Sequence, residues 1–171
     1  MKIGCPKEIK PQEFRVGMTP DAAREAIAHG HEVMIEKNAG IGAGFADAAY
    51  VAAGARIVDT AEEVFAGAEM IVKVKEPQPA ERKRLREGQV LFTYLHLAPD
   101  PGQTRDLMAS GATCIAYETV TDARGGLPCW RRCPRWRGGL RRRSGHGPCR
   151  RPTADRASFW AACPAWRRPM W

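Results

Sequence analysis

Hydrophobic and polar positions along the first 128 residues alternate between short apolar runs and longer mixed segments. The apolar runs, rich in β-branched residues, predict strands at 2–6, 31–36, 55–58, 70–74, 90–94 and 113–117. The segments between them predict helices at 20–29, 47–53, 60–65, 79–87 and 100–111. The run 70–74 is apolar apart from Lys73, which is typical of a strand buried on both faces.

Capping residues support these helix boundaries. Thr19 can accept from free backbone N–H groups, Pro20 needs no donor at a first helical position, and Gly30 can end that helix. Thr60 and Glu63 have the spacing of a capping box. Strands that alternate with helices predict an α/β fold, an open and mainly parallel sheet with helices on both faces, in the manner of a Rossmann-like domain.

Composition changes sharply after residue 128. All five tryptophans and twelve arginines lie in residues 129–171, with Asp155 as the single acid there. This segment carries a net charge of +11. The whole chain carries +8, so residues 1–128 carry −3. The segment also has no Val, Ile, Tyr or Lys, and so little apolar surface cannot offset the entropy of ordering a chain. We expect one domain at 1–128 and a non-native, disordered extension at 129–171.

Three cationic side chains follow predicted strands. Arg15 lies in the loop after the first strand, Lys75 follows the strand 70–74, and His96 comes two residues after the strand 90–94. In open parallel sheets the loops at the carboxyl ends of strands converge on ligands, so these three can face one crevice. Arg suits a carboxylate, Lys can polarise a carbonyl oxygen, and His can exchange a proton near neutral pH. The set fits a small 2-oxo acid.

Each of these residues also has an ordinary interpretation. An Arg or Lys near a strand end is commonly just solvated, and a single His is commonly a surface or core residue. Spacing alone leaves both interpretations open.

A glycine-rich stretch at 39–44 invites comparison with a dinucleotide-binding loop. Gly40, Gly42 and Gly44 follow a predicted strand and precede a predicted helix, and Asp59 lies 19 residues beyond Gly40. The spacing is G-x-G-x-G, however, and lacks the third position of G-x-G-x-x-G. The signal for a nucleotide site is therefore weak.

The basic tail offers a second motif of low specificity. Cys129, Cys133, His146 and Cys149 could act as four zinc ligands within an arginine- and tryptophan-rich segment that binds nucleic acid. Their spacing is loose, and no strand or helix pattern surrounds them. A zinc- or nucleic-acid-binding module remains the alternative from another functional class.

Several sequence segments together resemble the N-terminal portion of the alanine dehydrogenase family. These are GCPKEIK at 4–10, EFRVGMTP at 13–20, HGHEV at 29–33, VKVKEP at 72–77 and LFTYLH at 91–96. They occur in the right order over essentially all of residues 1–128. The related nicotinamide nucleotide transhydrogenases share this N-terminal fold, and the Lys-Glu-Pro and Tyr-Leu-His segments in combination favour the alanine enzyme.

The resemblance implies a reaction and roles for the three cations. The family catalyses the reversible, NAD-dependent oxidative deamination of L-alanine to pyruvate and ammonia. It implies that Arg15 holds the substrate carboxylate, that Lys75 contacts the carbonyl oxygen and that His96 is the proton donor and acceptor. The family's nucleotide loop and its downstream catalytic carboxylate lie beyond the matched region, so we expect no cofactor-binding residues in this chain and no activity from it alone. A folded remnant that binds oxo acids without turnover is a further possibility.

Partners and location follow from the same resemblance and from hydropathy. We expect a small-molecule substrate, no nucleic-acid or membrane partner, and the homo-oligomeric assembly of the family. No apolar run approaches the roughly 20 residues that cross a bilayer, and the N-terminus leads directly into a strand pattern. These features predict a cytoplasmic protein.

The composition of the tail also suggests a change of reading frame. With suitable codons, regrouping bases by one position converts residues 129–136 to Leu-Leu-Ala-Pro-Met-Ser-Glu-Val. The same phase converts residues 159–171 to a string that resembles the family segment before its nucleotide loop. We therefore hypothesise a one-nucleotide shift near codon 128.

Overall fold

The computed structural model describes residues 1–127 and shows one parallel six-stranded sheet. The strand order is β3-β2-β1-β4-β5-β6, and all five neighbouring pairs are parallel. The strands are β1 (Lys2–Cys5), β2 (Glu32–Glu36), β3 (Arg56–Val58), β4 (Met70–Val72), β5 (Val90–Thr93) and β6 (Thr113–Ala116). The predicted α/β class and parallel sheet are confirmed.

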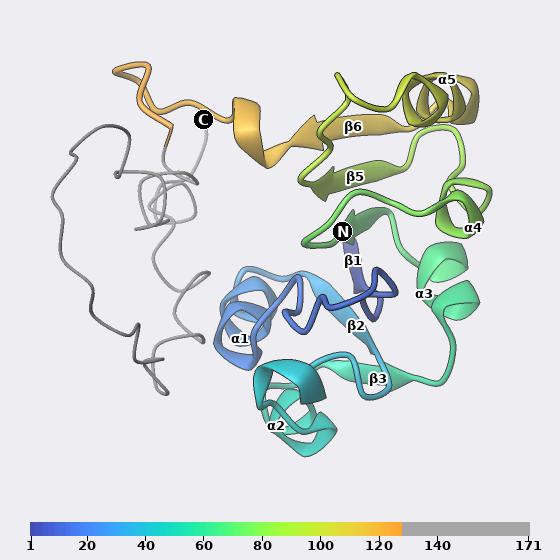
Figure 1. Ribbon diagram of the computed structural model, residues 1–171. Coiled ribbons are helices and arrows are strands. Elements are labelled where there is room, and N and C mark those ends of the chain that lie inside the picture. The colour runs from blue at the N-terminus through green and yellow to red at the C-terminus, as the bar shows by residue number, and fades with distance from the viewer. Residues whose placement is uncertain (128–171) are drawn as a thin grey trace, which may run out of the picture.

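Helices cover both faces of this sheet, as Figure 1 shows. On one face lie α1 (Pro20–Ala28) and α2 (Asp47–Ala52), and on the other lie α3 (Ala61–Gly67), α4 (Pro79–Arg82) and α5 (Pro101–Ser110). Two short 3₁₀ helices, η1 (Ile41–Ala43) and η2 (Tyr117–Thr119), follow β2 and β6. Each face has its own apolar cluster, so alternate residues of a strand belong to different cores.

Two predicted elements end two or more residues early in the structure, and tertiary contacts explain both. β4 ends at Val72 because the Glu8 carboxylate accepts the Val74 N–H at 2.7 Å. The predicted helix 79–87 ends at Arg82. Beyond it, the chain turns so that the Gln89 side chain donates to backbone carbonyls of residues 65 and 68 at 2.9 and 2.8 Å.

The strand order creates a switch point between β1 and β4. From β1 the chain continues through α1 to β2, whereas from β4 it continues through α4 to β5 on the opposite face and in the opposite direction. The loops after these two neighbouring strands therefore separate at the carboxyl edge, where such sheets bind ligands. This edge positions Arg15 and Lys75.

Some sequence predictions fall on residues 128–171, outside the described part of the chain. They are the disordered extension and the zinc or nucleic-acid module of Cys129, Cys133, His146 and Cys149. Within residues 1–127, no helix combines the length and the apolar character that a membrane span requires.

Candidate functional site at the carboxyl edge of the sheet

Arg15 lies in the loop that joins β1 to α1 and is paired with Glu13. Its Nε and Nη2 atoms donate to the two carboxylate oxygens of Glu13 at 2.7 and 2.5 Å, in a bidentate arrangement. The side chain of Arg15 is 55% exposed, while that of Glu13 is 8% exposed. Partial burial raises the pKa of Glu13, but the hydrogen bonds from Arg15 outweigh it and hold this pKa below its ordinary value. The Arg15 guanidinium is therefore partly exposed, while its Nε and Nη2 atoms donate to the more buried carboxylate of Glu13.

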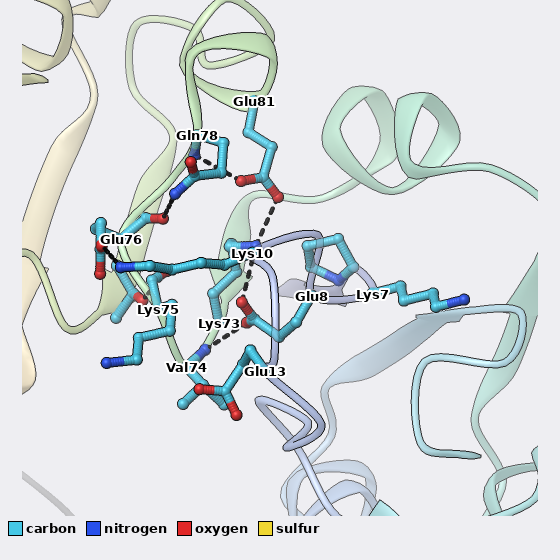
Figure 2. Close-up of polar contacts among 12 residues, drawn as sticks. Lys7, Glu8, Lys10, Glu13, Lys73, Val74, Lys75, Glu76, Gln78 and Glu81 are labelled. Carbon is cyan, nitrogen blue, oxygen red and sulfur yellow. Dashed lines mark hydrogen bonds and ion pairs between the residues drawn. The ribbon is translucent and has the colours of Figure 1, made fainter. Parts of the chain in front are cut away.

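Lys75 comes two residues after Lys73, which belongs to a buried ionic network at the end of β4 (Figure 2). The Lys73 ammonium lies 2.6 Å from a Glu81 carboxylate oxygen and 3.4 Å from one of Glu8, and these side chains are 1–2% exposed. Glu8 also accepts the Val74 N–H, so the network ties the loop after β1 to the loop after β4. Burial raises the pKa of Glu8 despite the nearby ammonium.

The Lys75 ammonium points away from the buried network, as Figure 2 shows. Burial raises the pKa of the neighbouring Glu76, but the hydrogen bond from Lys10 outweighs it, and the positive charge of Lys75 adds a smaller lowering of this pKa and of that of Glu13. The Lys75 backbone carbonyl accepts from the Thr93 hydroxyl at 2.9 Å, which fixes the end of this loop against β5.

His96 lies beyond β5 and is exposed. Its ring is stacked on that of Tyr94, with centroids 5.7 Å apart and an interplanar angle of 5°. Tyr94 in turn meets the buried Tyr117 ring edge-on at 5.0 Å. The Tyr117 hydroxyl donates to the Lys73 carbonyl at 2.7 Å. The aromatic rings thus connect His96 to the end of β4.

A small apolar pocket of about 50 Å³ opens between these loops. Arg15, Val74, Tyr94 and Tyr117 contribute to its lining, together with apolar residues of the loop after β1 and of the η1 loop. The candidates Lys75 and His96 lie one and two residues from the lining residues Val74 and Tyr94. The structure thus brings Arg15 to the pocket itself and places the other two candidates on the loops that border it.

Several residues of this edge were not among the sequence candidates. Glu13 and Glu8 lie in the same loop as Arg15, and Glu118 follows β6, where its carboxylate accepts the His96 N–H at 2.7 Å. The carboxyl-edge rule that selected the cations could also have selected Glu118, which comes directly after a predicted strand. No sequence signal distinguishes the buried Glu8 from a solvated one.

The glycine stretch 40–44 serves packing within the chain. A Cβ atom on Gly42 would lie 2.8 Å from the Phe14 carbonyl oxygen, and one on Gly40 would lie 2.7 Å from the Tyr50 ring. The space beside both glycines is thus filled by protein, and α2 begins three residues after Gly44. This loop does not fit a dinucleotide phosphate group, which needs open backbone at the start of a helix.

Across residues 1–127, no three His, Cys, Asp or Glu side chains gather in a group that could hold a metal ion.

A doubly wound parallel sheet with a small pocket at its carboxyl edge, where such sheets hold their ligands, defines a Rossmann-like α/β domain. Comparison with known proteins specifies the family. Residues 4–131 match the family model "Alanine dehydrogenase/PNT, N-terminal domain". The chain belongs to this family.

Individual relatives show which branch of the family is nearer. The chain is 56% identical over 128 residues to an alanine dehydrogenase of Halomonas elongata, covering 75% of this chain and 34% of that protein. A solved L-alanine dehydrogenase matches with a TM-score of 0.73 and 54% identity, over 75% of this chain and 36% of the other. A transhydrogenase from Sinorhizobium meliloti matches at 0.68 and 27% identity, over 72% and 35%. The chain spans about a third of the length of these relatives and is nearer to the alanine dehydrogenases.

Proposed function

We propose that residues 1–127 form the substrate-binding domain of an alanine dehydrogenase, which converts L-alanine, water and NAD⁺ to pyruvate, ammonium, NADH and a proton. The observation that carries this proposal is the exposed Arg15 guanidinium at the mouth of a pocket bordered by the loops of Lys75 and His96. The 56% identity to an alanine dehydrogenase supports the choice of reaction. The substrate class is a small 2-oxo acid and the corresponding amino acid.

Each candidate has a role that matches its chemistry. The guanidinium of Arg15 binds the substrate carboxylate through two parallel hydrogen bonds. Since Glu13 already accepts from this guanidinium, the substrate carboxylate must displace Glu13 or share the guanidinium with it. Lys75 polarises the carbonyl oxygen of pyruvate, and His96 donates and accepts the proton at that oxygen. Bound NAD would supply hydride acceptance at the substrate carbon.

Turnover by the 171-residue polypeptide on its own is not expected. The glycine-rich loop 40–44 does not provide a fitting dinucleotide cradle, and orientation of the reacting groups supplies a large part of enzymatic rate enhancement. Purified chain should form no NADH above background from L-alanine and NAD. Alanine-dependent NADH formation would contradict this.

Pyruvate-dependent thermal stabilisation tests the binding proposal directly. Pyruvate in excess should raise the melting temperature of the full 171-residue chain, since a ligand that binds only the folded state stabilises it. Arg15→Ala should abolish the increase, while Arg24→Ala, which removes an exposed arginine on α1, should retain it. Equal stabilisation of wild type and Arg15→Ala would refute the role of Arg15.

We also propose a cytoplasmic location for the protein. Cys5 and Cys114, the cysteines of the described region, are free thiols, which agrees with a reducing cytoplasmic location.

The family match ends at residue 131, close to the change in composition after 128, which agrees with a change of frame near codon 128. Resequencing codons 125–135 and finding codons that cannot be regrouped into the family segment would refute the frame hypothesis.

A further inference from the structure

His96 has a backbone conformation that residues with a side chain rarely adopt. Its φ angle is +47°, in the left-handed region, where contact between Cβ and the following carbonyl oxygen is unfavourable. Such conformations persist where surrounding contacts determine them, and they concentrate at functional sites. The contacts around residues 94–96 therefore identify what holds His96 in place.

Two side chains from later elements hold this turn through its backbone. The Glu118 carboxylate on η2 accepts the His96 N–H at 2.7 Å and the Leu95 N–H at 3.1 Å. Gln103 on α5, which is 1% exposed, donates from Nε2 to the Leu95 carbonyl at 2.5 Å. Consecutive N–H groups that converge on one carboxylate form charge-assisted hydrogen bonds, which are about twice as strong as neutral ones.

The conformation of this turn determines where the imidazole lies. With φ positive at residue 96, the ring lies parallel to that of Tyr94, and Tyr94 lines the pocket beside Arg15. An extended conformation at residue 96 would turn its side chain away from this stack. The orientation of the proton-transfer group relative to the pocket thus depends on a carboxylate that is 22 residues away in sequence.

We propose that Glu118 is a positioning residue for His96. Its carboxylate binds the two amides of the turn, keeps residue 96 left-handed and so directs the imidazole toward the substrate carbonyl. The inference rests on the proposed role of His96 in proton transfer. Glu118 acts through the backbone of residue 96 and does not itself touch the substrate.

The test uses the isotopically labelled 171-residue chain with three variants. Glu118→Ala removes the acceptor, Glu118→Gln keeps one neutral oxygen that can still accept both amides, and Glu25→Ala removes an exposed carboxylate on α1 as the control. Melting curves establish that each variant is folded. If Glu118→Ala does not fold, Glu118→Gln decides the question.

The first measurement concerns the backbone and needs no ligand. The three-bond coupling between the His96 amide and Hα protons reports φ, and the amide proton shifts of Leu95 and His96 report the hydrogen bonds. In Glu118→Ala the coupling should move to that of extended backbone and both amide protons should move upfield. In Glu118→Gln the coupling should be preserved and the amide shifts should be smaller than in wild type. Wild-type values in Glu118→Ala, or in Glu118→Gln if that variant alone folds, would overturn the proposal.

The second measurement concerns the pocket and separates this inference from the proposed function. Pyruvate should slow modification of His96 by diethyl pyrocarbonate in wild type and in Glu25→Ala, as followed by mass spectrometry. In Glu118→Ala this protection should fall by about tenfold, the loss expected for a charge-assisted hydrogen bond. Pyruvate should still stabilise that variant through Arg15. Full protection in Glu118→Ala would overturn the inference alone, whereas absence of protection in wild type would overturn the proposed function and leave the backbone measurement to decide the role of Glu118.

Discussion

At the scale of residues, stability at the carboxyl edge depends on the buried ion network of Glu8, Lys73 and Glu81. One ammonium lies between two carboxylates, and the three side chains are 1–2% exposed. Removing one partner of a buried ion pair leaves uncompensated charge in a low-dielectric region. The network therefore stabilises the carboxyl edge only while Lys73 is present.

Lys73→Met tests this dependence on the buried ammonium. The variant should lose about 3 to 5 kcal/mol of unfolding free energy at neutral pH, because two buried carboxylates lose their counter-charge. Urea denaturation measures the loss. The exposed Lys83→Met on the same side of the sheet should change stability by less than about 0.5 kcal/mol, as surface substitutions usually do. A similar small change for Lys73→Met would refute the proposed energetic role.

Cys5 gives the chain a defined stability change at alkaline pH. Complete burial is the main cause that raises the pKa of this thiol from 9.0 to about 12. The unfolded chain releases the thiol proton near pH 9 while the folded chain retains it, so stability falls as pH rises between these values. The slope is at most about 1.4 kcal/mol per pH unit.

Comparison with Cys5→Ala isolates this effect from other titrating groups. Between about pH 8 and pH 10, wild type should lose about 1.4 kcal/mol more unfolding free energy than Cys5→Ala. Urea denaturation at both pH values measures the difference. Equal losses in the two proteins would contradict the assigned pKa shift.

At the scale of elements, close packing of α3 against β1 depends on Gly4. A Cβ atom there would lie 2.6 Å from a Val64 methyl and 2.8 Å from the Ala68 Cβ. A Cβ atom on Gly67, also in α3, would meet only the flexible end of Met34 at 3.1 Å. Substitution of Gly4, in β1, therefore tests the close contact with α3, and substitution of Gly67, in α3, serves as its control.

Gly4→Ala should destabilise the chain by about 1 to 3 kcal/mol through overpacking. Gly67→Ala should be near neutral, because the gain in helix propensity, at most about 1 kcal/mol, offsets a contact that Met34 can relieve. Thermal or urea denaturation of both variants provides the comparison. Equal effects would mean that the α3–β1 contact is looser than the geometry indicates.

Within residues 1–127, alternation of apolar runs and capping signals was enough to predict the six strands and the five α-helices. It could not predict that the helix 79–87 would end at Arg82, because the bonds of Gln89 to carbonyls of α3 and its C-cap are tertiary. It could not predict the strand order either, since pairing of β1 with β4 depends on packing of α3 across the sheet. Local pattern therefore determines the elements, and long-range contacts determine their ends and neighbours.

At the scale of the molecule, the sequence predicted the edge at which the candidate site lies. Arg15, Lys75 and His96 all follow strands, and parallel strands place such residues at one edge. The sequence could not predict their anionic partners. Glu13 occupies the Arg15 fork and Glu118 binds the backbone of His96, and both contacts depend on loop conformations that lack a periodic pattern.

Convergence of the three cations on one small anion is the central claim, and a pyruvate titration tests it most directly. Amide and side-chain resonances of the labelled chain should shift together at the loops after β1, β4 and β5, including the Arg15 Nε–H group, the Lys75 Nζ group and the His96 ring. The three groups should give one common dissociation constant, which should be weakened at least about tenfold in Arg15→Lys because a bidentate contact is lost. Shifts confined to one loop, shifts elsewhere on the sheet, or the absence of saturable shifts would contradict the account.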